Sequence, residues 1–190
     1  MSAPDTPSCS TPAGESLLLH VCCGPCATAT IDYWRGEGLV VSGFYYNPNI
    51  QPLLEHRRRL EGVRILAEAR TLPLTEDNAY DPVEWFRLVG LREKNRCGAC
   101  IALRMERAAR QAAELGVGSF ATTLAISPWQ DHDAIRSGGR EAAEQYGLTF
   151  VYEDLRRLFG ESRRQARDLN LYRQQYCGCI ISEWERYRDR

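Results

Sequence analysis

Short apolar runs alternate with longer amphipathic segments along the 190-residue chain, and this alternation limits the possible folds more than any other feature. Residues 16–21, 39–45 and 120–126 have the length and composition of buried strands. Residues 98–115 carry apolar side chains at steps of three and four residues, which is typical of a helix that buries one face. Strands and helices in alternation predict a parallel sheet covered on both faces.

Shorter segments complete the prediction, which is a three-layer α/β/α fold with a mainly parallel sheet of about five strands. Further strands are expected at residues 72–74 and 148–152. Further helices are expected at residues 25–35, 51–70, 83–89, 131–146, 161–168 and 180–187, with Gly138 and Gly139 as a point where the helix over 131–146 can break. We expect residues 1–14, rich in Ser, Thr, Pro and Gly, to be a disordered tail, and residues 15–190 to form a single catalytic metal-binding domain.

The charge and hydropathy of the chain argue against two classes of protein. The 24 basic and 25 acidic residues nearly cancel, so the chain has no global basic field for nucleic acid, although a local basic patch stays open. No apolar run approaches the roughly 18 residues of a membrane-spanning helix, and the N-terminus lacks the charged and apolar regions of a signal peptide. We therefore expect a cytoplasmic protein that does not act at a membrane.

Seven of the eight cysteines fall into three short groups, and the exception is Cys9 in the expected tail. The groups are Cys22, Cys23 and Cys26; Cys97 and Cys100; and Cys177 and Cys179. In a cytoplasmic chain, grouped cysteines are metal ligands or redox groups more often than structural disulfides. Soft thiolates of this kind select zinc, copper(I) or iron–sulfur clusters.

The number of grouped cysteines leaves several kinds of site open. Four thiolates satisfy one tetrahedral zinc ion or one four-iron cluster, so seven exceed the need of a single site. Two metal sites side by side, or one metal site beside redox-active thiols, account for all of them. A closed zinc site with spare cysteines and a pair of transient redox disulfides are the alternatives. Cys22, Asn47 and Ser127 each follow an expected strand, and parallel sheets bind ligands beyond the carboxyl ends of their strands, which favours a functional site.

The same segments resemble a known family. The following motifs occur in order between residues 16 and 182: LLLHVCCGPCATA, FYYNPNIQP with HRRRLE, RCGACIALRMERAA, FATTLAISPWQDHDAI and LYRQQYCGC. Together they resemble the QueH type of epoxyqueuosine reductase. The resemblance implies a single-domain metalloenzyme with a [4Fe–4S] cluster and an adjacent mononuclear metal, expected to be iron, and it makes the seven grouped cysteines the ligands. Some relatives carry Asp where this chain has Cys26, so the resemblance supports Cys26 least.

The resemblance also implies the reaction and its partners. Epoxyqueuosine at wobble position 34 of a tRNA anticodon loop would lose its epoxide oxygen to give queuosine, the final step of queuosine biosynthesis, with electrons from an unidentified donor. We hypothesise that the cluster passes on the electrons and that the second metal polarises the C–O bond as a Lewis acid. The fold resembles the adenine-nucleotide hydrolase-like (HUP) domains of tRNA thiolases, but HVCCGPC replaces their Gly/Ser-rich phosphate loop, which argues against ATP as a substrate.

Other residues are candidates for proton transfer and substrate binding. Tyr46, Asp131 and His132 flank expected strand ends and are candidate proton donors, although Asp131 also suits a helix N-cap and His132 an ordinary surface position. Recognition of one base in an RNA loop uses aromatic stacking and phosphate contacts. The candidate substrate-binding residues are Asn47, Asn49, Arg58, Thr122, Thr123, Ser127, Trp129, Arg173 and Tyr176.

Two rival functions stay open at this point. A tRNA sulfur-transfer enzyme on the same fold would use a cluster to carry sulfide and would need ATP to activate the base. A non-enzymatic zinc-binding module would dock RNA through metal-held loops and would need no iron. ATP binding and iron content therefore separate these functions from the reductase.

Overall fold

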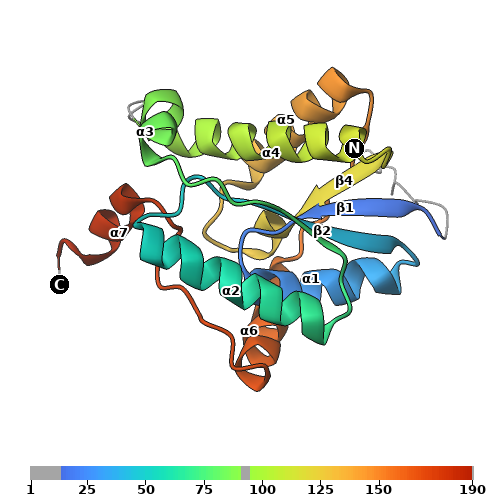
Figure 1. Ribbon diagram of the computed structural model, residues 1–190, viewed down its shortest axis with the longest axis horizontal. Coiled ribbons are helices and arrows are strands. Elements are labelled where there is room, and N and C mark those ends of the chain that lie inside the picture. Colours follow the sequence, from blue (N-terminus) through green and yellow to red (C-terminus); the bar gives the residue numbers. More distant parts are fainter. Residues whose placement is uncertain (1–13, 91–94, 190) are drawn as a thin grey trace, which may run out of the picture.

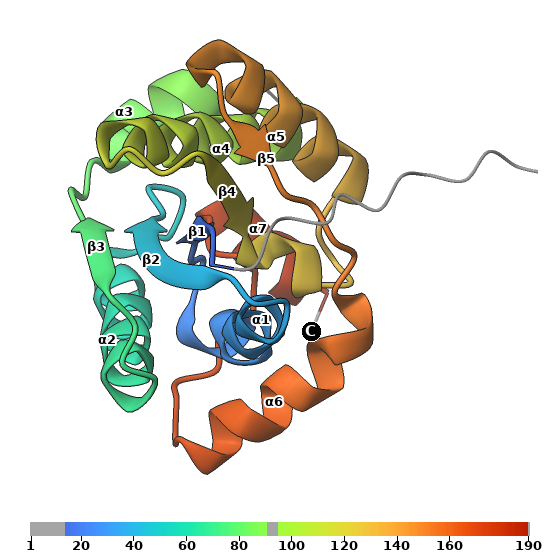
Figure 2. The same ribbon diagram turned by 90° about the vertical axis from the view of Figure 1, so that its right-hand side faces the viewer.

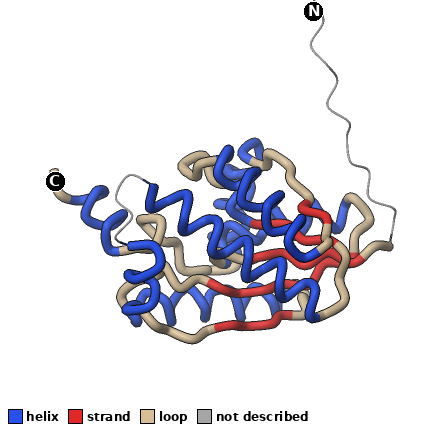
Figure 3. The backbone as a smooth tube through the Cα atoms, turned by 90° about the horizontal axis from the view of Figure 1, so that it is seen from above, coloured by secondary structure: helices blue, strands red, loops and turns tan. Residues whose placement is uncertain are grey.

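The computed structural model describes residues 14–90 and 95–189, and its centre is a five-stranded sheet in the order β3-β2-β1-β4-β5. The strands are β1 (Ser16–His20), β2 (Val40–Tyr46), β3 (Leu74–Asp77), β4 (Ser119–Thr122) and β5 (Thr149–Phe150). All four pairings are parallel, and Figure 3 shows the strands side by side among the helices. After β1 the chain adds β2 and β3 on one side of β1, and it then adds β4 and β5 on the other side. The carboxyl ends of β1 and β4 therefore form the topological switch point, where such sheets bind ligands.

Helices cover both faces of the sheet, as Figure 2 shows. One face carries α1 (Gly24–Gly36), α2 (Leu53–Ala69) and α6 (Phe159–Asp168), and the other carries α4 (Arg96–Glu114) and α5 (His132–Tyr146). Two short helices, α3 (Pro82–Trp85) and α7 (Ile180–Tyr187), lie beyond the carboxyl ends of the strands (Figure 1), and α3 continues as a π-helical turn over Phe86–Gly90. The described residues confirm the predicted three-layer α/β/α fold.

The side chains of β1 explain why both faces need a cover. Leu17 and Leu19 are fully buried in the cluster formed with α1, α2 and α6. Leu18, between them, is fully buried in the second cluster, with α4 and α5. Successive strand residues point to opposite faces, so a strand that is apolar throughout has to be buried on both.

Two predicted strands are shorter in the structure. The strand predicted over 120–126 ends at Thr122, and Thr123–Ile126 form a 3-10 turn. The Thr122 hydroxyl accepts a hydrogen bond from the Leu124 amide, so this side chain caps the turn and ends the strand. The strand predicted over 148–152 is reduced to Thr149–Phe150 at the sheet edge. The third strand, predicted over 72–74, instead runs from Leu74 to Asp77.

The predicted break at Gly138 and Gly139 is wrong, because α5 is continuous from His132 to Tyr146. Both glycines serve packing instead. A Cβ on Gly138 would lie 3.3 Å from the Cα of Ala102 on α4, and a Cβ on Gly139 would lie 2.2 Å from the ring of Phe150. The missing side chains let α5 approach its neighbours closely.

Three other predictions concern the limits of the domain and its setting. The tail predicted over residues 1–14 falls outside the described residues except for Gly14, whose amide donates to the Gly38 carbonyl at 2.9 Å. The boundary at residue 15 and the likeness to adenine-nucleotide hydrolase-like domains stay predictions. Among the helices that the structure describes, none combines the length and apolar character needed to cross a membrane.

Gly24, the glycine of the HVCCGPC segment, sets the distance between α1 and α2. A Cβ on Gly24 would lie 2.6 Å from the backbone oxygen of Gly62, which cannot turn aside. We expect Gly24→Ala to lower the free energy of unfolding by about 1–3 kcal/mol because it overpacks this contact. The matched control is Gly62→Ala, because a Cβ there meets nothing within 4 Å, and we expect no loss or a gain of about 0.4–1 kcal/mol. Urea unfolding of both variants measures the difference, and equal effects would contradict the prediction.

Candidate metal centre

Cys22, Cys23 and Cys26 form a compact thiol triad at the switch point of the sheet. Cys22 follows β1, Cys23 is the N-cap of α1 and Cys26 lies in the first turn of α1. Their three Sγ atoms lie within 4.8 Å of one another, and those of Cys22 and Cys23 are 3.8 Å apart. A tetrahedral ion with metal–sulfur distances of about 2.3 Å separates its thiolates by about 3.8 Å. The triad therefore fits a single thiolate-bound ion, with three protein ligands and one position left for another group.

Polar side chains from two other segments hold the triad. The Thr123 hydroxyl, beyond β4, donates to Cys22 Sγ at 3.1 Å and accepts from the Cys22 amide at 2.9 Å. The Gln174 amide Nε2 donates to Cys23 Sγ at 2.9 Å. Partners that orient ligands in this way fix the geometry of a metal site.

The three thiols of the triad differ in protonation. Hydrogen bonds with Cys23 and Cys26 lower the pKa of Cys22 well below its usual range. The same contacts with Cys22, together with burial, raise the pKa of Cys23 and of Cys26. Cys22 is therefore the most acidic thiol of the triad. A metal ion that binds all three as thiolates displaces their protons.

The other four cysteines gather beyond the carboxyl ends of the strands. Cys97 and Cys100 lie in the first two turns of α4, and Cys177 and Cys179 lie in the segment before α7. Arg96 on α4 pairs with Glu185 on α7 at 3.0 Å, which joins the two segments. Cys100 and Cys179 pack in one small apolar cluster with Trp85 and Val89. These four cysteines do not meet the 4.8 Å spacing of the triad among the described residues.

Arg59 of α2 holds the cysteine segment before α7 in place. Its guanidinium is buried, with Nε 2.8 Å from the Glu55 carboxylate. Its Nη1 donates to the Cys177 carbonyl at 2.7 Å and its Nη2 to the Tyr176 carbonyl at 3.2 Å. The guanidinium also lies over the Tyr176 ring at 5.2 Å. One buried ion pair thus fixes the backbone that carries Cys177.

A cavity of about 660 Å³ joins the two groups of cysteines. All three thiols of the triad line it, and Cys177 lines it from the second group. Gln130, another lining residue, donates to Cys177 Sγ at 3.3 Å. The basic and aromatic residues of the lining are Arg59, Arg104, Trp129, Phe159, Arg163, Arg173, Tyr176 and Arg186. The cavity can therefore hold a substrate in reach of both groups of thiols.

The family model for epoxyqueuosine reductase QueH matches residues 17–185 of this chain. The chain belongs to the QueH family. An epoxyqueuosine reductase QueH of Dehalococcoides mccartyi is 40% identical over 171 residues, which cover 90% of this chain and 94% of the relative. Those of Thermotoga maritima and Acinetobacter baylyi are each 36% identical, and the matches cover 90% and 88% of this chain and 92% and 80% of the relatives.

Most of the substrate-binding residues predicted for this QueH chain lie at the cavity. Its lining includes Asn47, Asn49, Ser127, Trp129, Arg173 and Tyr176. Asn47 donates to the Val21 carbonyl at 2.9 Å, and its Oδ1 is buried with no partner, as is that of Asn49. Thr123 contacts Cys22, as described above. Thr122 instead caps its turn and contacts His20, and Arg58 lies over the Tyr172 ring at 5.0 Å, so neither lines the cavity.

The three candidate proton donors also lie outside the cavity lining. Tyr46 stacks on Phe44, and burial raises the pKa of its hydroxyl. The Asp131 carboxylate accepts a hydrogen bond from the Ala134 amide at 2.9 Å. Asp131 is therefore the N-cap of α5, which is the alternative to a proton donor expected from the sequence. The role of Tyr46, Asp131 and His132 as proton donors in a QueH enzyme stays a prediction.

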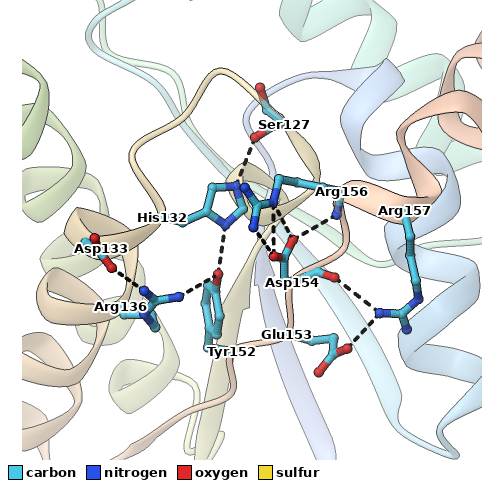
Figure 4. A network of polar contacts seen from close by, with 9 residues as sticks. All are labelled: Ser127, His132, Asp133, Arg136, Tyr152, Glu153, Asp154, Arg156 and Arg157. Atoms are coloured by element: carbon cyan, nitrogen blue, oxygen red, sulfur yellow. Dashed lines mark hydrogen bonds and ion pairs between the residues drawn. The ribbon is translucent and has the colours of Figure 1, made fainter.

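Figure 4 shows how His132 is held. Its Nε2 lies 3.0 Å from the Ser127 carbonyl and its Nδ1 lies 2.8 Å from the Tyr152 hydroxyl. Since a carbonyl only accepts, Nε2 carries a proton and donates to Ser127, and in the neutral ring Nδ1 then accepts from Tyr152. The Tyr152 hydroxyl in turn accepts from Arg136 at 3.3 Å. His132 thus anchors the segment that carries Ser127 and Trp129 into the cavity.

Three residues of the QueH site are missed by the sequence prediction as site residues: Arg104, Gln130 and Gln174. The run Arg57–Arg59 predicts phosphate contacts, but Arg59 is instead buried beside Glu55. For Arg104 a signal exists, because it is a charged residue one turn after Cys100 in the apolar stripe of its helix, between Ile101 and Met105. Arg59 resembles its exposed neighbours Arg57 and Arg58 in sequence. Its burial depends on the distant segment that contains Cys177.

Proposed function

We propose that this chain reduces epoxyqueuosine at the wobble position of tRNA to queuosine, the last step of queuosine biosynthesis, in the cytoplasm. Membership of the QueH family supports this reaction. The observation that carries the proposal is the thiol triad in the wall of a 660 Å³ cavity that also reaches Cys177. A buried wall of thiols suits a redox metal, and a cavity of this size suits an extruded nucleotide.

The two groups of cysteines are suited to different metal groups. The close spacing of the triad fits a mononuclear ion, which we expect to be iron. The wider group of Cys97, Cys100, Cys177 and Cys179 supplies four thiolates, the number that a [4Fe–4S] cluster requires. Each thiolate of such a cluster binds a different iron atom, so this group does not need the close spacing of a single-ion site. This division is part of the proposal.

The reaction breaks both C–O bonds of the epoxide, forms one C=C bond and consumes two electrons and two protons, with the oxygen leaving as water. Held by the two groups of cysteines, the metal groups would relay the two electrons from an external reductant and would supply a Lewis acid. The chain itself positions these groups, through Thr123 on Cys22, Gln174 on Cys23 and Gln130 on Cys177. The buried Oδ1 atoms of Asn47 and Asn49 lack partners and can accept from the hydroxyls of the cyclopentane ring.

The rim of the cavity suits an RNA loop. Trp129 is 74% exposed and meets the Phe159 ring edge-on at 5.0 Å, and Arg163 lies over Phe159 at 5.7 Å. Exposed aromatic rings stack on unpaired bases, and arginines beside them contact phosphates. We assign Trp129 to stacking and Arg163 and Arg173 to phosphate contacts.

Arg173→Ala is expected to weaken tRNA binding, with the largest loss at low salt. Loss of one phosphate contact lowers the slope of log affinity against log salt by about 1. Arg167→Ala is the control, because Arg167 is exposed but does not line the cavity. Filter binding over a range of salt concentrations measures the slope, and equal slopes for the two variants would contradict the assignment of Arg173.

An anaerobic assay tests the proposed function. The protein is reconstituted with iron and sulfide and then incubated with epoxyqueuosine-containing tRNA and a chemical reductant. We expect queuosine on nucleoside analysis, with no need for ATP. Full activity of the protein loaded with zinc alone would overturn the proposal. ATP-dependent addition of sulfur to the tRNA would establish the sulfur-transfer alternative, and RNA binding by a catalytically inert zinc form would establish a binding module.

A further inference from the structure

Arg104 is a buried cation between the two groups of cysteines. It lies on α4 one turn after Cys100, is 2% exposed and lines the cavity. Its Nε donates to the Cys100 carbonyl at 3.1 Å. The chemistry described so far does not use this residue.

No carboxylate among the described residues forms an ion pair with Arg104. Arg59, the other buried arginine of the site, has Glu55 at 2.8 Å. A buried charge without a partner is unfavourable, so Arg104 requires negative charge elsewhere in the site.

Thiols of both groups share the cavity wall with Arg104, and as metal-bound thiolates they would supply that negative charge. Cys22 and Cys177 line the same cavity as Arg104, and Arg104 also donates to the Cys100 carbonyl. Cys22 belongs to the triad, whereas Cys100 and Cys177 belong to the second group. The geometry therefore joins one cation to both groups of ligands.

We propose that Arg104 is a positioning residue shared by the two metal groups, the counter-charge that stabilises both sets of metal-bound thiolates and favours the arrival of electrons. The proposal rests on the proposed function in one respect, namely that the two groups of cysteines hold metals. A divalent ion with three thiolates is anionic, and so is a [4Fe–4S] cluster with four. Reduction adds further negative charge, which a nearby buried cation stabilises.

Removal of the charge should therefore make reduction less favourable. We expect Arg104→Gln and Arg104→Met to lower the equilibrium constant for one-electron reduction at least tenfold, which corresponds to a midpoint potential about 59 mV more negative. Both variants should also weaken binding of Co²⁺ to the metal-free protein, because the bound thiolates lose their counter-charge. Arg104→Lys keeps the charge and should restore both properties to within about threefold of the original protein.

The experiment uses the full chain. A redox titration followed by electron paramagnetic resonance gives the midpoint potential of the reconstituted protein, and the thiolate–Co²⁺ absorption gives the Co²⁺ affinity. Arg110→Gln is the matched control, because Arg110 lies on the same helix and is exposed, so neither quantity should change. Two neutral variants, Arg104→Gln and Arg104→Met, are made because one of them can fail to fold. The variant whose circular dichroism spectrum matches that of the original protein is the one used. If neither folds, the Lys variant decides, because a changed potential with the charge retained overturns the proposal and an unchanged potential supports it.

The outcomes separate the proposal from the proposed function. An unchanged potential and Co²⁺ affinity in a folded neutral variant overturn the role of Arg104, even if the original protein makes queuosine. An unchanged potential with a raised KM for tRNA also overturns it and assigns Arg104 to substrate binding. A shifted potential in a protein that makes no queuosine supports the role of Arg104 and sinks the proposed reaction.

Discussion

Cys23→Ser is expected to abolish queuosine formation, with a loss of more than about 100-fold. Cys23 is 1% exposed, occupies the N-cap position of α1 and has its Sγ within 4.8 Å of those of both other thiols of the triad. A serine hydroxyl fits the same space but is not a soft ligand, so the fold should survive while the ion of the triad is lost. Nucleoside analysis of tRNA measures the activity, and metal analysis measures the content of iron.

Metal content makes this prediction specific to the triad. We expect Cys23→Ser to keep the visible iron–sulfur absorption, because the four cysteines assigned to the cluster are intact, and to lose only the additional iron. Cys9→Ser is the control, because Cys9 precedes the matched residues 17–185 and should change neither quantity. Loss of the iron–sulfur absorption in Cys23→Ser would show that the cysteines are divided in another way, and full activity would remove the triad from the mechanism.

Arg59→Met is expected to have the largest effect on stability. The substitution leaves Glu55 buried without its partner at 2.8 Å and frees the carbonyls of Tyr176 and Cys177. Removing one partner of a buried ion pair costs about 3–5 kcal/mol. In a protein of this size, a change of 1 kcal/mol moves the melting temperature by about 2–4 °C, so we expect a fall of roughly 6–20 °C.

The control for this prediction is Arg64→Met on the same helix. Arg64 also pairs with a glutamate, Glu76, at 2.6 Å, but it is 49% exposed. Exposed ion pairs contribute about 0–1 kcal/mol, so the melting temperature should fall by only a few degrees. Differential scanning calorimetry of both variants compares the two pairs. A similar shift in both would mean that the Arg59 pair does not hold the segment with Cys177 in place.

The sequence predicts the parts of this structure that depend on local pattern. The apolar residues of β1 and the three-and-four spacing in α4 are enough to predict a parallel sheet with helices on both faces. The strand predicted over 120–126 is too long because the hydroxyl of Thr122 caps a 3-10 turn there. The apolar residues that follow Thr122 therefore lie in the turn and not in the strand. The predicted break at the glycines of α5 is wrong because these residues allow close contacts with Ala102 and Phe150. Such contacts between distant segments cannot be predicted from the local sequence pattern.

The same limit applies to the site. The cysteines were found because they occur in short groups, and the cavity lining includes most of the predicted polar residues. Gln174 and the buried role of Arg59 are not predicted, because their partners, Cys23 and Cys177, lie 151 and 118 residues away in the chain. A side chain whose role is set by such a distant partner looks like any surface arginine or glutamine in the sequence.

The order of the chain has a consequence for how the site is built during synthesis. The triad is translated first, with β1 and α1, whereas Cys177 and Cys179 come more than 150 residues later. Until that late segment meets Arg59 and α4, the part of the cavity wall that it supplies is missing. A nascent chain thus offers the three thiols of the triad to metals and oxidants before that wall is in place. The correct metals can be enclosed only after the ribosome has released the segment that closes the site.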